Sequence, residues 1–175
     1  MYLFRRLLPC LALLTILSIP SQARADASPT FDFSGFYVPF GVNVGAALRS
    51  PGNNGLLLGG ELSALYFWEH AGFTILGGYA DYLRDFGLGV HRVSFGPEFG
   101  MYFCGLDAGP VFEVGHGATH LGGRARLFAS LAFLTLYVGE WYRPAGAPTW
   151  STEIGVLLKL PTLHYKEGKG MNFDI

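Results

Sequence analysis

The sequence predicts an all-β fold, namely an antiparallel up-and-down transmembrane β-barrel of about eight strands. Two patterns carry this prediction: apolar and polar residues alternate over long stretches, and glycine (25 residues) and aromatic residues (15%) are abundant. Successive side chains of a strand point to opposite faces, so this alternation is typical of β-strands. No apolar run beyond the N-terminal region reaches the length of a spanning helix. A closed barrel is then the remaining way to satisfy the backbone in lipid.

The N-terminal segment has the pattern of a secretory signal peptide. Two arginines precede an apolar run at 7–19, and small residues follow at 23–25. The run is shorter than the about 20 residues that a spanning helix needs. We therefore expect a signal peptide over 1–25 and a single barrel domain over 26–175.

The charge of the chain argues against a nucleic-acid partner, and its cysteine content argues against an intramolecular disulfide. Cleavage after Ala25 reduces Lys+Arg from 12 to 9 against 13 acidic residues, a formal charge of −4, which does not favour a nucleic-acid partner. If Cys10 leaves with the signal peptide, Cys104 is the remaining thiol and no intramolecular disulfide can form.

The clearest strand covers 90–102. Phe95 and Phe99 fall on its apolar face, and Arg92 and Glu98 fall on the other. Bulky apolar residues that alternate with charges and glycines are typical of a barrel with an apolar outside and a polar inside. The further strands are expected at 36–48, 56–68, 73–82, 106–115, 120–129, 134–142 and 150–160. The register of 73–82 stays open because both of its faces mix apolar and small residues.

The connections between these strands alternate in length. The longer ones are expected at 49–55, 83–89, 115–119 and 143–149, and the tight ones at 69–72, 104–105 and near Ser130. Such alternation is expected when one end of a barrel faces the cell exterior and the other faces the periplasm.

Charged residues gather on the polar faces of the strands. An eight-stranded barrel has room inside for side chains only, and buried charges are tolerated when they are paired. Five acids and four bases allow such pairing, so we expect an interior polar network. Its members are Glu61, Arg92, Glu98, Asp107, Glu113, Arg124, Arg126, Glu153 and Lys159.

A soluble lipocalin-like barrel that binds an apolar ligand is an alternative. It would have to enclose Phe, Leu, Tyr and Trp side chains from nearly every strand, more volume than eight strands can hold. Aromatic residues near the strand ends also fit the girdles of membrane barrels. These residues are Tyr66, Trp68, Tyr102, Phe103, Trp141, Tyr142 and Trp150.

The pattern resembles the small eight-stranded bacterial outer-membrane barrels typified by the transmembrane domain of outer membrane protein A. The resemblance implies a monomer in the outer membrane, with outer-membrane lipid and the barrel-assembly machinery as partners. Such families usually end in an apolar alternating strand with a terminal aromatic residue. Here Met171, Phe173 and Ile175 alternate, and the last residue is Ile. Residues 162–175 are therefore either the final strand or a tail beyond the barrel.

Catalytic and metal-binding patterns are weak. Lipid A deacylases of similar size carry a His-x-Ser pair, which this sequence lacks, and His91 and Ser94 are three residues apart and so face opposite sides of a strand. His116 and His120 lie in a glycine-rich stretch without an evident third ligand. We expect no catalytic, cofactor-binding or metal-binding residues, although a catalytic group assembled across strands stays open.

These observations favour a non-enzymatic protein with a structural role in the envelope. The expected loops are too short for adhesion, and a charge-filled interior disfavours a pore. The alternatives are a lipid A-modifying or lipid-binding barrel enzyme and the soluble ligand-binding barrel.

Overall fold

The computed structural model describes residues 34–50, 52–68, 73–131, 133–144, 149–166 and 170–172, and gives only the backbone for 161–164, 166 and 170–172. The expected signal peptide at 1–25 and the lead-in at 26–33 lie outside the described residues, as do Phe173 and Ile175. Every regular element in the described part of the chain is a strand. That part contains no helix that is long and apolar enough to cross a membrane.

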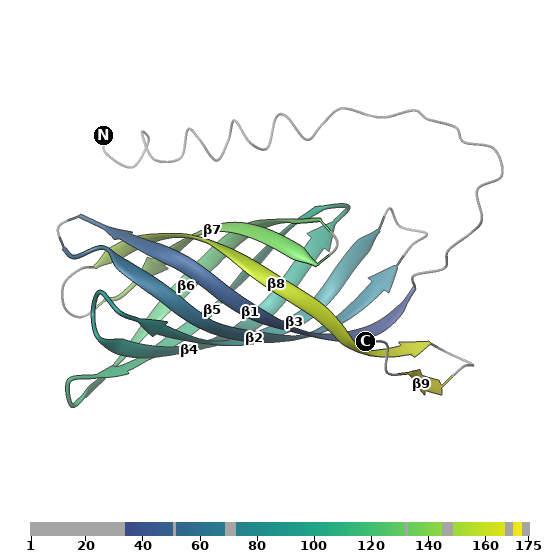
Figure 1. Cartoon of the computed structure of the whole chain (residues 1–175), viewed down its shortest axis with the longest axis horizontal. Coiled ribbons are helices and arrows are strands. Elements are labelled where there is room, and N and C mark those ends of the chain that lie inside the picture. Colours follow the sequence, from purple (N-terminus) through teal and green to yellow (C-terminus); the bar gives the residue numbers. More distant parts are fainter. Residues whose placement is uncertain are drawn as a thin grey trace, which may run out of the picture. The chain divides into compact units, whose positions relative to one another are not determined.

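Eight antiparallel strands form a closed up-and-down barrel, drawn in Figure 1. Each strand pairs with the next one along the chain, and β1 also pairs with β8, which closes the sheet. The barrel strands are β1 (Gly35–Arg49), β2 (Gly55–Trp68), β3 (Thr74–Asp85), β4 (Val90–Met101), β5 (Cys104–Gly115), β6 (Ala118–Leu131), β7 (Leu134–Tyr142) and β8 (Trp150–Lys166). A ninth strand, β9 (Gly170–Asn172), follows β8.

The closing pair β1–β8 runs from Phe36 opposite Tyr165 to Arg49 opposite Ser151, with a register shift at Val38 and Pro39. Proline has no backbone N–H to donate, so a shift in register is where a strand tolerates it. The last barrel strand is β8, because β9 pairs only with the end of β8, at His164–Lys166. Residues 163–165 thus belong to β8 and help to close the barrel against β1, whereas β9 adds a short hairpin to the end of β8 and does not pair with β1.

The two ends of the barrel differ in their connections. One end, which we call the loop end, carries the connections at 50–54, 86–89, 116–117 and 143–149; the other, the turn end, carries those at 69–73, 102–103 and 132–133. The expected longer loop at 115–119 is wrong. His116 and Gly117 alone join β5 to β6, and both have positive φ (51° and 75°), which matches the twist of a two-residue hairpin turn.

Several strand boundaries also differ from expectation. β3 continues to Asp85, where a loop was expected from 83, and β1 includes Arg49. The turn between β4 and β5 lies at Tyr102, with φ of 56°, and Phe103, so Cys104 begins a strand and does not form the turn. The open register of β3 is settled by burial, because its odd-numbered residues from 79 to 85 are buried.

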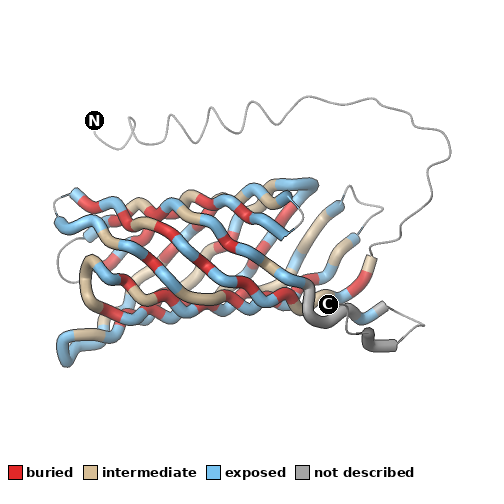
Figure 2. The backbone as a smooth tube through the Cα atoms, in the orientation of Figure 1, coloured by how far each residue is buried: buried red, intermediate tan, exposed pale blue. Residues whose placement is uncertain are grey.

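Burial alternates along the strands, as the banding in Figure 2 shows. Apolar side chains cover the outside, where Phe95 has 48% of its surface exposed. Polar and charged residues fill the inside; Glu153, for example, is 0% exposed. The apolar part of the interior includes a cluster of Ala47, Leu57 and Leu83. The barrel therefore has the reverse polarity of an ordinary soluble domain, in which the largest apolar side chains lie inside.

Tyr137 crosses the interior over two inward glycines. A Cβ atom added at Gly45 would lie 2.6 Å from the Tyr137 hydroxyl, and one added at Gly155 would meet the Tyr137 ring at 2.6 Å. The hydroxyl donates a hydrogen bond to Asn43 Oδ1 at 2.9 Å. These glycines therefore make room for an aromatic side chain inside a narrow barrel.

Candidate functional site

The barrel interior is the candidate site, because it gathers seven carboxylates and six cationic side chains that pair with one another. All nine residues of the expected network point inward. Eight of them are buried, and the side chain of Lys159 is 14% exposed. Each charge thus lies where it needs an opposite charge close by.

A first group lies near the loop end, and we call it the loop-end cluster. Its members are Arg49, Asp85, Arg92, Glu113, Arg143 and Glu153. Arg92 lies at the centre and pairs with both Asp85 and Glu153. Its Nε also lies 3.8 Å from Glu113, whose other carboxylate oxygen accepts a hydrogen bond from Arg143 at 2.6 Å.

Asp85 joins this cluster to the loops. One of its carboxylate oxygens accepts from both Arg49 and Arg92, and the other accepts from the backbone N–H groups of Gly87 and Leu88 at 3.0 Å. Arg49 in turn donates to the carbonyl of Asn53 at 2.7 Å. The connections β1–β2 and β3–β4 are therefore held by the same buried carboxylate.

Trp141 lies against two arginines of the loop-end cluster. The guanidinium carbon of Arg92 is 4.1 Å from its ring centroid, and that of Arg143 is 5.4 Å away. Trp141 is 1% exposed, so its expected place in an outer aromatic girdle is wrong. Cation–π contact is most favourable when the cation is buried, as Arg92 and Arg143 are, and this accounts for a tryptophan among charges.

The middle of the barrel is held by Arg124 and Asp81. Arg124 donates to the carboxylate of Asp81 and, at 2.7 Å, to the hydroxyl of Ser94. Arg124 also lies 3.9 Å from Glu153 of the loop-end cluster. Asp81 lies 3.6 Å from Arg126, which is nearer the turn end. These contacts connect both halves of the interior into one network.

A second group lies nearer the turn end of the barrel, and we call it the turn-end cluster. Its members are Glu61, Glu98, Asp107, Arg126 and Lys159. Arg126 pairs with Glu61 and, at 2.9 Å, with Asp107. Lys159 lies 2.7 Å from Glu61 and 2.8 Å from Glu98. Phe128 and Tyr137 pack beside this cluster and leave a pocket with no room for a water molecule.

Sequence reasoning missed four charged members of the network. Asp81 and Asp85 lie on β3, whose register stayed open, and Arg49 and Arg143 lie where turns were expected. Charge balance gives no signal for them, because the excess of one acid is the same with and without the four residues. With all four included, the interior holds seven acids and six bases, and the four missed residues are two of each sign.

The residues weighed for catalysis are kept apart by the sheet. His91 is exposed on the outside and Ser94 is buried inside. His116 lies in the β5–β6 turn, where its Nε2 lies 2.9 Å from the Leu88 carbonyl. Within the described ranges, no three His, Cys, Asp or Glu side chains are grouped so that they could hold a metal ion.

Comparison with known proteins adds little to this geometry. No family model matches the chain, and no solved structure matches it. A probable pectinesterase/pectinesterase inhibitor from Arabidopsis thaliana is 33% identical over 69 residues, which make up 39% of this chain and 12% of that protein. A match to so small a part of another protein carries no function to this barrel.

The interior can therefore do one thing plainly: it fills the barrel with paired charges. Each cation has a carboxylate partner, and guanidinium groups carry several donors in a fixed geometry that suits more than one acceptor. Such a network links strands that are far apart in sequence, as Arg92 of β4 and Glu153 of β8 do.

Proposed function

We propose that this chain is an outer-membrane β-barrel with a structural role in the envelope, and that its interior ion-pair network plugs the barrel. The observation that carries the proposal is the contrast between the two faces of the sheet. Soluble monomers rarely expose contiguous apolar patches larger than a few hundred Å². Here large apolar side chains cover every strand outside, and the charges lie within. Lipid is the solvent that suits such a surface.

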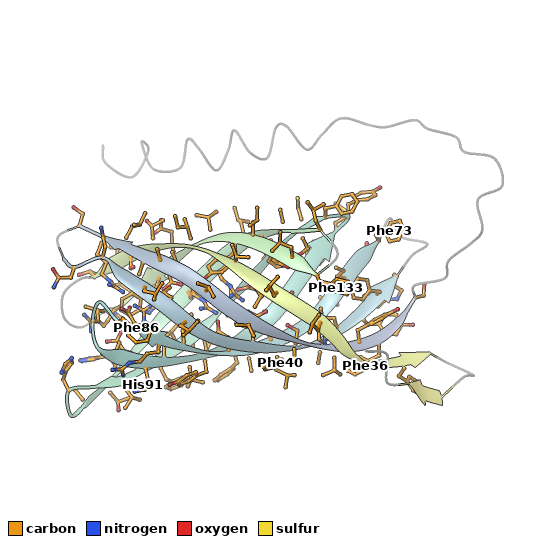
Figure 3. All side chains as sticks on the ribbon, in the orientation of Figure 1. Phe36, Phe40, Phe73, Phe86, His91 and Phe133 are labelled. Carbon is orange, nitrogen blue, oxygen red and sulfur yellow. The ribbon has the colours of Figure 1, made fainter. Side chains whose placement is uncertain are left out.

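The aromatic residues of the outer face support the same proposal. Tyr142 and Trp150 are in contact near the loop end, with ring centroids 4.7 Å apart, and Tyr66 and Trp68 are 4.5 Å apart near the turn end. Figure 3 places Phe73 and Phe133 at the turn end as well. Aromatic residues at both ends of an apolar band are typical of the two membrane interfaces.

The lipocalin-like alternative receives less support. A barrel that binds an apolar ligand needs an apolar interior with space for it, and ligand pockets commonly enclose about 300–1,000 Å³. The pocket beside the turn-end cluster has no room for a water molecule and is lined by Glu61, Asp107, Arg126 and Lys159.

Fractionation tests the location. The full chain, expressed with its N-terminal segment in a Gram-negative host, is expected in the outer-membrane pellet after a urea wash and in solution only after detergent is added. Recovery in the detergent-free periplasmic extract would contradict the proposal.

The structural role is tested by comparing cells with and without the gene. We expect higher permeability to a large antibiotic without it and an unchanged lipid A mass spectrum. A changed lipid A spectrum would instead support the enzyme alternative.

A further inference from the structure

Arg84 differs from every other basic side chain that the structure describes. Arg49, Arg92, Arg124, Arg126, Arg143 and Lys159 all face inward and pair with carboxylates. Arg84 lies on the outer face of β3, one residue before the loop end, and forms no ion pair within the described ranges. Its guanidinium carbon lies 6.0 Å from the ring centroid of Phe86.

Two polar side chains stand beside Arg84 on the same outer face. His91 of β4 is the direct cross-strand partner of Arg84, and its Nδ1 forms a hydrogen bond with the hydroxyl of Tyr82. A tyrosine hydroxyl that donates to Nδ1 leaves the imidazole proton on Nε2. Arg84 and His91 then present donors at one level of the barrel, close to its loop end, where Figure 3 labels His91.

The surface around this group is apolar. Leu58 is paired with Arg84, Val93 with Tyr82 and Val114 with His91, and all three are exposed. A cationic and hydrogen-bonding group above exposed aliphatic side chains matches a molecule with an anionic head and acyl chains.

We propose that Tyr82, Arg84 and His91 form a binding site for the phosphate headgroup of a membrane lipid. The guanidinium of Arg84 pairs with the phosphate, His91 donates a second hydrogen bond, and Tyr82 orients His91. The acyl chains lie over Leu58 and Val93. This inference rests on the proposed membrane location, because it places the group at the level of lipid headgroups.

The opposite side of the barrel provides a natural control. Glu140 of β7 is outward and exposed, and among the acidic side chains in the described part it is the one without a cationic partner; it accepts a hydrogen bond from Thr152 at 2.7 Å. A carboxylate repels a phosphate, so the Glu140 side should not select the lipid.

Competition between two lipids tests the site. The purified full chain is mixed in detergent with equal amounts of phosphatidic acid and phosphatidylcholine, and native mass spectrometry measures which lipid stays bound. We expect wild type to retain phosphatidic acid preferentially. Arg84→Gln should reduce this preference about tenfold and His91→Gln about threefold, since each removes a donor to a charged acceptor. Arg84→Lys should keep most of the preference.

Glu140→Gln is the matched control and should leave the preference unchanged. Circular dichroism confirms that each variant keeps its strand content. The inference is overturned if Arg84→Gln retains phosphatidic acid as well as wild type does. It is also overturned if inorganic phosphate displaces the lipid as readily as phosphatidic acid does, because the site would then bind an anion and not a lipid.

Insertion of the same preparations into phosphatidylcholine vesicles separates this inference from the proposed function. A wild-type chain that does not insert contradicts the membrane location itself. If the chain inserts but its preference for phosphatidic acid does not depend on Arg84, the result contradicts the lipid site alone.

Discussion

The loop-end and turn-end clusters have similar composition but different surroundings. In the loop-end cluster, Asp85 and Arg49 bind loop backbone as well as each other, and Trp141 lies against two of the arginines. In the turn-end cluster the partners of the charged groups are side chains, and the side chain of Lys159 is 14% exposed. The difference indicates that the same chemistry seals one end tightly and leaves the other more accessible to water.

Removing one charge at the loop end should have the largest effect. Asp85→Asn keeps the acceptor for the Gly87 and Leu88 amides but leaves Arg49 and Arg92 without their shared carboxylate. Stranding a buried charge costs about 3–5 kcal/mol. We expect the urea midpoint of the chain in phospholipid vesicles to fall accordingly. Leu136→Ala on the outer face is the control and should cost less than about 1 kcal/mol, since lipid is as apolar as leucine. Equal losses would refute the loop-end account.

A packing change between the clusters should have an intermediate effect. Gly45→Ala brings a methyl group within 2.6 Å of the Tyr137 hydroxyl. Overpacking of this kind costs about 1–3 kcal/mol. The added methyl group would also lie 2.8 Å from the Ile154 carbonyl oxygen. The double variant Gly45→Ala/Tyr137→Phe removes the hydroxyl and should therefore recover part of the loss, in the same unfolding measurement. A double variant that is no better would show that the glycine is not there for Tyr137.

The smallest effect is expected at the turn end. Lys159→Met removes a cation. Glu61 is still paired with Arg126, and Glu98 still accepts a hydrogen bond from the Ser63 hydroxyl at 2.9 Å. Glu98 loses its cationic partner in the described part but keeps the Ser63 donor, and Lys159 is 14% exposed, so water can take the place of its ammonium group. The loss should lie at the lower end of the about 1–3 kcal/mol that an unsatisfied buried polar group costs. A loss as large as that of Asp85→Asn would erase the distinction between the two clusters.

Periodicity alone predicted the barrel and the inward face of most strands. It succeeds at β4, where from Arg92 to Met101 apolar residues alternate with charged residues, serine and glycine, because a one-residue slip would turn every side chain to the wrong face. It also placed Glu61, Arg126 and Glu153 on the inner face, where the structure has them. Membrane location itself stays a proposal.

Periodicity failed where contacts with distant strands, and not the local sequence pattern, decide which face of the sheet a side chain takes. β3 has apolar residues on both faces, because Tyr79 and Leu83 pack inside beside Asp81 and Asp85, so no register could be chosen. Trp141 was placed outside as an aromatic residue near a strand end, whereas it lies inside against two arginines. Such contacts join strands far apart in sequence, and no local pattern reports them.

The central claim is that the apolar face of the sheet meets lipid and the polar face does not. Single cysteines at Phe95 and at Ser94, which are adjacent on β4 but face opposite sides, test it most directly in a Cys104→Ala background. Each is labelled with a fluorophore in vesicles that contain a lipid-attached quencher. We predict strong quenching from position 95 and little from position 94. Equal quenching at both positions, or none at 95, would contradict the account.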